Sequence, residues 1–181
     1  GLLRMAHVHH HQREASDLEA AQVEQLGNRL SLPVDVLHLD VGLAATPATL
    51  REARYGALTE AANASRADAV VTAHHAEDQL ETMLLALARG SGPRGLAGME
   101  AARSWDEGVV LARPLLQVTR GDLTDLGGQM ELPFCDDPGN EDPTTHRGRL
   151  RRDVLPALEA LHPGVAARAA AMAPVHAASA G

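Results

Sequence analysis

Three short apolar segments, each followed by a segment with helix signals, constrain the fold of this chain most. The apolar segments are rich in Val, Ala and Leu, as β-strands are, and the following segments carry N-capping residues or end at Gly or Pro. The predicted strands are residues 5–9, 34–39 and 68–73, and the predicted helices are residues 16–30, 46–64 and 76–89. Repeated strand–helix units predict an α/β fold, a Rossmann-like parallel sheet with helices on both faces.

Elements beyond residue 90 are shorter and more polar. The sequence predicts an irregular Gly-rich segment over residues 91–98 and a strand over residues 109–112. Three further helices are predicted over residues 119–126, over residues 144–161 and from residue 163 on. Gly127 and Gly128 are expected to end the first of these helices, residues 119–126. We therefore predict an α/β domain over residues 1–135, followed by a basic loop and a C-terminal helical extension over residues 136–181.

Composition narrows the function classes. The net charge is −8, yet all 16 basic residues are arginines, so anions must be bound by arginine or by backbone amides. The single cysteine, Cys135, excludes a disulfide framework, a Cys-ligated zinc site and a Cys-held iron–sulfur cluster within the chain. No apolar run approaches the ~20 residues needed to cross a bilayer, so we expect a cytoplasmic protein without a membrane partner.

The segment HHAEDQLET, residues 74–82, concentrates the polar chemistry at the junction of a predicted strand and helix. Asp78 and Glu81 are three positions apart and so share one helix face. Ligands of parallel sheets bind at this edge, where strands end and helices begin. Two carboxylates there favour a bound cation, either a metal ion or an ammonium group. Glu77 is expected only to complement the helix dipole.

Other candidate residues carry positive charge or imidazole groups. His10 closes the first strand, at the edge expected for His74. Arg113 precedes a proline at a strand end, where an extended arginine suits phosphate or carboxylate. Four arginines lie close together in an otherwise acidic chain and are the one place where a polyanion is expected to bind, namely Arg147, Arg149, Arg151 and Arg152.

These motifs, in this order, resemble those of the tRNA(Ile)-lysidine synthases, which are N-type ATP pyrophosphatases of the PP-loop type. The matching segments are AHVHHHQR, REARYGAL, HHAEDQLET, ARGSGPRGLAGM, RPLL and DDPGNEDPTTHRGRLRRDVLPAL. They extend from about Ala6 to Pro163. The resemblance implies an adenine nucleotide alpha-hydrolase-like fold and a ligase that uses ATP and Mg²⁺ in tRNA modification.

The implied reaction adenylates cytidine 34 of the CAU-anticodon isoleucine tRNA and attaches free L-lysine to form lysidine. By the same resemblance Asp78, Glu81 and Arg147 are catalytic, and the carboxylates bind or deprotonate the lysine ammonium. His10, His74 and Arg113 are implied near the nucleotide, and the tRNA-binding residues are Arg149, Arg151 and Arg152. Arg113 and Arg147 are implied to stabilise phosphates and developing charge.

Some positions depart from the family pattern. The phosphate-binding signature SGGxDS is missing, so we expect the chain to begin after it and to be inactive in adenylation by itself. Glu77 replaces an aspartate, and Gly148 replaces an asparagine. A homodimer is one option for the oligomeric state.

Three alternatives remain at this point. A sibling tRNA 2-thiocytidine synthetase needs cysteines that the chain lacks. A metal-dependent hydrolase would use His74, His75 and Asp78 as metal ligands, with His10 as a further ligand. The lysidine synthase interpretation assigns no metal ligands. A non-catalytic module would bind nucleotide or tRNA without turnover.

Overall fold

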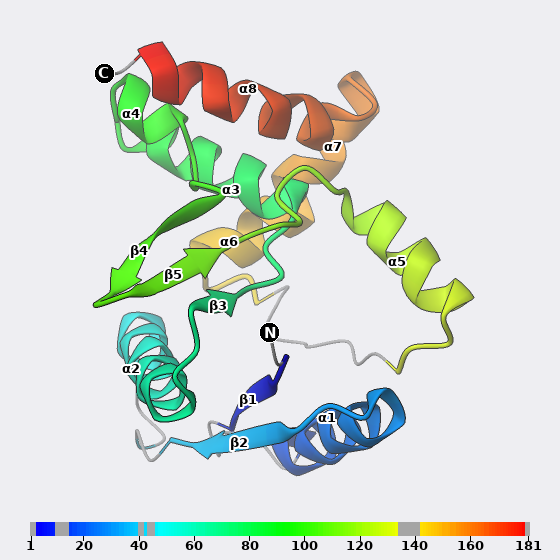
Figure 1. The fold of residues 1–181 in the computed structure, drawn as a ribbon. Coiled ribbons are helices and arrows are strands. Elements are labelled where there is room, and N and C mark those ends of the chain that lie inside the picture. Colours follow the sequence, from blue (N-terminus) through cyan, green and yellow to red (C-terminus); the bar gives the residue numbers. More distant parts are fainter. Residues whose placement is uncertain (1–2, 10–14, 40–41, 43–45, 134–141, 180–181) are drawn as a thin grey trace. The chain divides into compact units, whose positions relative to one another are not determined.

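The computed structural model describes residues 3–9, 15–39, 42, 46–133 and 142–179 (Figure 1). They divide into two compact units, each built from several stretches of the chain. Unit 1 comprises residues 1–70, 104–110 and 132–135, and unit 2 comprises residues 71–103, 111–131 and 136–181. The predicted domain boundary after residue 135 lies outside the described residues. The predicted contribution of His10 to the site lies outside them as well.

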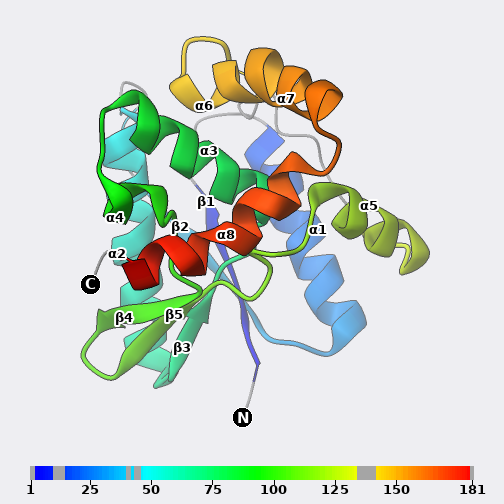
Figure 2. The same cartoon turned by 90° about the horizontal axis from the view of Figure 1, so that it is seen from above.

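Unit 1 contains a two-stranded parallel sheet. Strand β1 (Met5–His9) pairs with β2 (Val34–His38) in register from the first residue of each to the last. Helices α1 (Ala15–Leu30) and α2 (Pro47–Ser65) pack on these strands, which lie between them in Figure 2. This is the predicted arrangement, because parallel strands need a crossover helix between them.

Capping signals place helix α2 within a residue of its predicted bounds. The Thr46 hydroxyl accepts a hydrogen bond from the Thr49 amide at 3.2 Å, and Pro47 follows at the first turn, where its missing N–H is not needed. On α2, Tyr55 stacks on Trp105 with ring centroids 4.8 Å apart. The indole N–H of Trp105 donates to Thr59 at 2.6 Å, so two of the chain's few aromatic residues stabilise unit 1.

A second sheet has three strands. In spatial order they are β3 (Ala69–Val71), β5 (Val109–Ala112) and β4 (Ala102–Asp106). Backbone hydrogen bonds join Val110 to Asp68 and Thr72 to Ala112, advancing in the same direction along both strands, as in a parallel pair. The structure thus confirms the predicted parallel α/β class.

Strand β4 was not predicted from the sequence. It forms a hairpin with β5 across Gly108, whose φ of 75° suits a tight turn. Strand β3 is also less buried than its apolar sequence predicts, since Val71 is 59% exposed. Among the described residues, β3 pairs only with β5.

Unit 2 is mainly helical. Its helices are α3 (Ala76–Ala88), α4 (Pro93–Leu96), α5 (Arg120–Gln129), α6 (His146–Arg149), α7 (Leu155–Leu161) and α8 (Val165–Ser179). Helices α3 and α8 pack together through Ala76, Leu80, Ala166 and Ala170, all nearly fully buried. Small side chains at three of these positions allow the two helices to approach closely.

Two predicted helix features were wrong. Helix α5 continues through Gly127 and Gly128 to Gln129 instead of ending before them, since glycine inside a helix carries only a modest cost. The predicted basic helix of residues 144–161 consists instead of α6, a π-helical turn at Leu150–Val154, and α7. Among the described residues, no helix is long and apolar enough to cross a membrane.

Candidate functional site

The N-terminus of α3 follows β3 directly and sets the positions of the acidic side chains. His75 is the N-cap in an extended conformation, and its amide donates to Asp78 Oδ2 at 3.0 Å. A carboxylate at the third helical position satisfies an amide that would otherwise have no partner. Asp78 is therefore fixed by its own helix, with one oxygen engaged in the cap and the other directed elsewhere.

Glu77 links two helix N-termini. Its Oε2 contacts His75 Nδ1 at 2.8 Å and accepts the Arg120 amide, at the start of α5, at 2.9 Å. The hydrogen bond with Glu77 raises the pKa of His75, and burial opposes the rise. Burial acts to raise the pKa of Glu77, but the bonds from His75 and Arg120 outweigh it and lower that pKa. These contacts give Glu77 a structural role.

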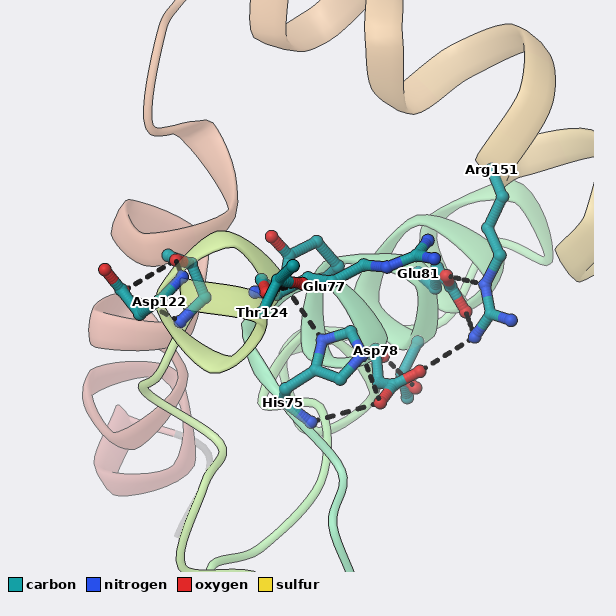
Figure 3. Close-up of polar contacts among 10 residues, drawn as sticks. His75, Glu77, Asp78, Glu81, Asp122, Thr124 and Arg151 are labelled. Atoms are coloured by element: carbon teal, nitrogen blue, oxygen red, sulfur yellow. Dashed lines mark hydrogen bonds and ion pairs between the residues drawn. The ribbon is translucent and has the colours of Figure 1, made fainter. Parts of the chain in front are cut away.

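Asp78 and Glu81 form a buried carboxylate pair that holds the Arg151 guanidinium (Figure 3). Arg151 Nε lies 2.5 Å from Glu81 Oε1, and its Nη2 lies 2.9 Å from Asp78 Oδ1. Glu81 is 0% exposed and Asp78 is 7% exposed. Burial acts to lower the pKa of Arg151, but the two carboxylates outweigh it and raise that pKa. The pair thus shares one cationic side chain of the chain itself.

The other basic residues of this segment lie differently. Arg147 approaches the pair, with Nη2 at 3.3 Å from the Thr82 hydroxyl and Nε at 3.8 Å from Glu81 Oε2. Arg149 and Arg152 are exposed, and Arg152 forms an ion pair with its neighbour Asp153. The structure therefore brings two of the four clustered arginines to the acids and leaves two on the surface.

Gly148 explains how this segment comes so close to the preceding loop. A Cβ at Gly148 would lie 2.0 Å from the carbonyl oxygen of Asp142, closer than any real contact allows. The local packing of this chain thus requires glycine at this position. The hydroxyl of Thr145 caps α6 by accepting the Gly148 amide at 2.9 Å, which fixes the start of the arginine segment.

Helix α3 presents Gln79 on a different face from the carboxylate pair. Gln79 holds the backbone of Met99 by accepting its amide at 2.7 Å and donating to its carbonyl at 2.9 Å. Gly98 has φ 67°, and a Cβ there would lie 2.7 Å from Gln79. The glycine of this loop therefore allows the backbone to approach Gln79 closely.

Arg113 is buried next to a cavity of about 970 Å³. Its side chain is 5% exposed, its Nη1 donates to the Glu100 carbonyl at 2.8 Å, and its Nε is buried without a hydrogen-bond partner. Gln79 and Arg94 also line this cavity, with small residues of α8 opposite. A buried guanidinium donor without a partner is costly, and an oxyanion is the kind of group that would satisfy it.

The described histidines of this region have partners within the chain. His74 Nδ1 lies 2.9 Å from the Thr72 hydroxyl, and His9, 2% exposed, contacts Asp17 at 3.0 Å. Within the described part of the chain, no three His, Cys, Asp or Glu side chains gather as a metal centre would need. His75 contacts Glu77 instead of joining His74 around a metal ion.

Sequence reasoning missed the contact of Arg151 with the acids. Arg151 and Glu81 are 70 positions apart, and nothing in the local pattern distinguishes Arg151 from Arg149 or Arg152. A buried acid pair needs a cation, and this general signal does not identify which arginine supplies it.

Comparison with known proteins gives one family. A model of the PP-loop domain matches residues 2–158. The chain is 47% identical over 162 residues to a tRNA(Ile)-lysidine synthase of Salinispora tropica, covering 87% of this chain and 48% of that protein. It is 45% identical to the tRNA(Ile)-lysidine synthase of Streptomyces coelicolor, over 87% of this chain and 45% of that protein. The chain thus spans about half the length of the curated relatives it matches.

The fold has a solved counterpart at low sequence identity. A U34-tRNA thiolase, NcsA, from Methanococcus maripaludis superposes with a TM-score of 0.76 at 16% identity, covering 96% of this chain and 61% of that one. This likeness concerns the fold alone. Together with the family match over most of the chain, it confirms the resemblance noted in the sequence: the chain belongs to the PP-loop domain family.

Proposed function

We propose that the protein containing this chain is a tRNA-modifying ligase, which adenylates cytidine 34 of the CAU-anticodon isoleucine tRNA with ATP and attaches free L-lysine. The observation that carries this proposal is the buried carboxylate pair Asp78 and Glu81, which already binds a cationic side chain at the N-terminus of α3. The similarity to tRNA(Ile)-lysidine synthases supports it. Cytoplasmic location and a homodimer remain expectations.

The carboxylate pair suits the amine-transfer step. In this step the ε-amine of lysine forms a bond to C2 of the base, the bond from C2 to the adenylated oxygen breaks, and AMP leaves. Lysine arrives as an ammonium ion and must lose a proton before it can attack. Asp78 and Glu81 would bind the ammonium through opposite charge, and one of them would take the proton. Arg147, which lies beside Glu81, would stabilise the negative charge that develops on the leaving group.

Arg113 is the residue that fits the anionic part of the nucleotide. Its buried and unpartnered Nε offers a donor that no protein group uses. A phosphate oxygen would satisfy this donor and compensate the buried positive charge. His74, hydrogen-bonded to Thr72, is placed near the nucleotide by the family resemblance alone.

The two exposed arginines suit RNA. Arg149 and Arg152 lie on the surface and would contact tRNA phosphates, which positions the substrate without reading its sequence. Arg151, assigned to the same role from the sequence, points instead toward the acids in this structure. Its contact with tRNA therefore requires that it leave them.

The 181 residues contain no SGGxDS motif. We therefore propose that the chain by itself forms no adenylate and can at most bind nucleotide or tRNA. ATP–pyrophosphate exchange measured with the chain alone should give no signal above background, and measurable exchange would overturn this part of the proposal. Mg²⁺ is implied by the family, and we assign it no residue.

Lysine incorporation tests the function directly. The natural gene product that contains these residues should incorporate labelled lysine into CAU-anticodon isoleucine tRNA in an ATP-dependent reaction. Asp78→Ala should lower the rate by at least about a hundredfold, the usual effect of losing a positioned acid or base. Asp125→Ala, which removes an exposed acid from α5, is the matched control and should leave the rate unchanged. No incorporation by the wild-type protein, or equal rates in both variants, would refute the proposal.

A further inference from the structure

Arg151 lies in an unusual piece of backbone. It belongs to the π-helical turn Leu150–Val154, directly before Pro156 near the start of α7. Proline has no amide hydrogen, and its ring conflicts with the carbonyl four residues earlier, here that of Arg152, so a regular α-helix cannot run through this point. Single π turns of this kind occur frequently at functional sites. The sequence therefore places Arg151 in a locally widened turn.

The Arg151 side chain contacts three of the four oxygens of the carboxylate pair. Its Nε and Nη2 contact both oxygens of Glu81, at 2.5 and 3.3 Å, and Nη2 also contacts Asp78 Oδ1 at 2.9 Å. The remaining oxygen, Asp78 Oδ2, accepts the His75 amide. Each of the four carboxylate oxygens already has a donor. An ammonium group needs several acceptors at once and would compete with Arg151 for the same oxygens and the same negative charge.

We propose that Arg151 is a displaceable counter-cation: it occupies the Asp78–Glu81 pair until the ammonium group of an incoming substrate takes its place. This inference rests on the proposed function in assigning the pair to a substrate amine. Exchange of one cation for another keeps the buried carboxylates paired, whereas an empty pair would leave charge buried without compensation. Arg151 thereby sets the affinity of the site for amines.

The surroundings of Arg151 allow it to leave. Its side chain is 22% exposed, while the Glu81 side chain is 1% exposed, so the arginine has access to solvent and the acid does not. The rotatable bonds of its long stem also let the guanidinium turn toward solvent. Once displaced, Arg151 can meet an RNA phosphate beside the exposed Arg149 and Arg152.

Chemical rescue of an arginine-deleted variant tests the proposal without any enzymatic activity. In Arg151→Ala of the 181-residue chain, butylamine should raise the thermal unfolding midpoint with increasing concentration. Butanol and sodium chloride at matched concentrations should not. Because it need not compete with Arg151, butylamine should bind this variant at least about tenfold more tightly than wild type. Arg152→Ala, which removes an exposed neighbour, should respond as wild type does.

The outcomes separate this inference from the proposed function. A folded Arg151→Ala variant that butylamine does not stabilise, or that binds it no better than wild type, overturns the displacement. Rescue by butylamine without any binding of lysine supports the displacement and contradicts lysine as the substrate. If Arg151→Ala does not fold, Arg151→Gln takes its place in the same titration. In wild type, the NMR signal of the Arg151 Nε–H group should move as butylamine saturates the site, and an unchanged signal contradicts the proposal.

Discussion

Two arginine–carboxylate contacts, one in each unit, have similar geometry and different surroundings. In unit 1, Arg4 joins Asp35 with bonds of 2.9 and 2.7 Å, and the two side chains are 44% and 34% exposed. In unit 2, Arg151 joins Glu81 at 2.5 Å, and the Glu81 side chain is 1% exposed. Water and salt screen the first contact, whereas the second holds a charge that has lost its hydration. Burial, and not bond length, makes the second contact a candidate site.

Glu81→Ala should give the largest effect on stability. It leaves Arg151 without its main partner and opens a space in the interior, so we expect a loss of about 3 to 5 kcal/mol in the free energy of unfolding. Urea denaturation of the 181-residue chain measures it. Asp35→Ala in unit 1 is the matched control and should cost only a small fraction of this value. Equal losses in both variants would remove the distinction between the two contacts.

Gly148→Ala should have the next largest effect, because it alters the approach of the arginine segment. The new Cβ would collide with the Asp142 carbonyl, and we expect a loss of about 1 to 3 kcal/mol from the resulting backbone shift. Gly128→Ala in α5 is the control, since nothing lies within 4 Å of a Cβ there, and it should stabilise by about 0.5 to 1 kcal/mol. If Gly148→Ala left the free energy of unfolding unchanged, the arginine segment would be able to shift without cost.

The contact between His75 and Glu77 should make stability depend on pH near the site. The pKa of His75 is raised above 6.5, so its contribution is complete below pH 6.5 and is lost as the pH rises through the raised value. The pKa of Glu77 is lowered below 4.5, so its contribution is complete above pH 4.5 and is lost as the pH falls through the lowered value. Urea midpoints across this range measure both. Glu77→Gln should flatten the profile, and an unchanged profile would contradict the assignment.

Asp35→Asn should have the smallest effect and should depend on salt. The Arg4 guanidinium lowers the pKa of Asp35 through their hydrogen bond, but both groups face water, where added salt screens their attraction. The difference in urea midpoint between wild type and this variant should therefore shrink as salt is added. A difference that persists at high salt would contradict the view that water and ions screen this contact.

The sequence alone placed the elements whose signals are local. Thr46 and Thr119 cap α2 and α5 where predicted, because a capping side chain bonds to backbone only a few residues away. Strand β4 was missed because Arg103 and Ser104 lack the apolar pattern of a strand, and only its hairpin partner makes it one. The end of α5 was missed because Gly127 and Gly128 are typical of a helix end, although a helix can continue through glycine at a modest cost.

The sequence predicted the two acids of the candidate site but did not predict which arginine contacts them. Asp78 and Glu81 could be placed on one helix face from their spacing, which helical geometry fixes within a single turn. Tertiary structure alone decided that Arg151, and not Arg149 or Arg152, reaches them across 70 positions. It also decided that the Gln79 side chain forms hydrogen bonds with the Met99 backbone. Local spacing determines which side chains share a face, but the identity of their partners depends on how distant segments pack, and no short window of sequence contains that information.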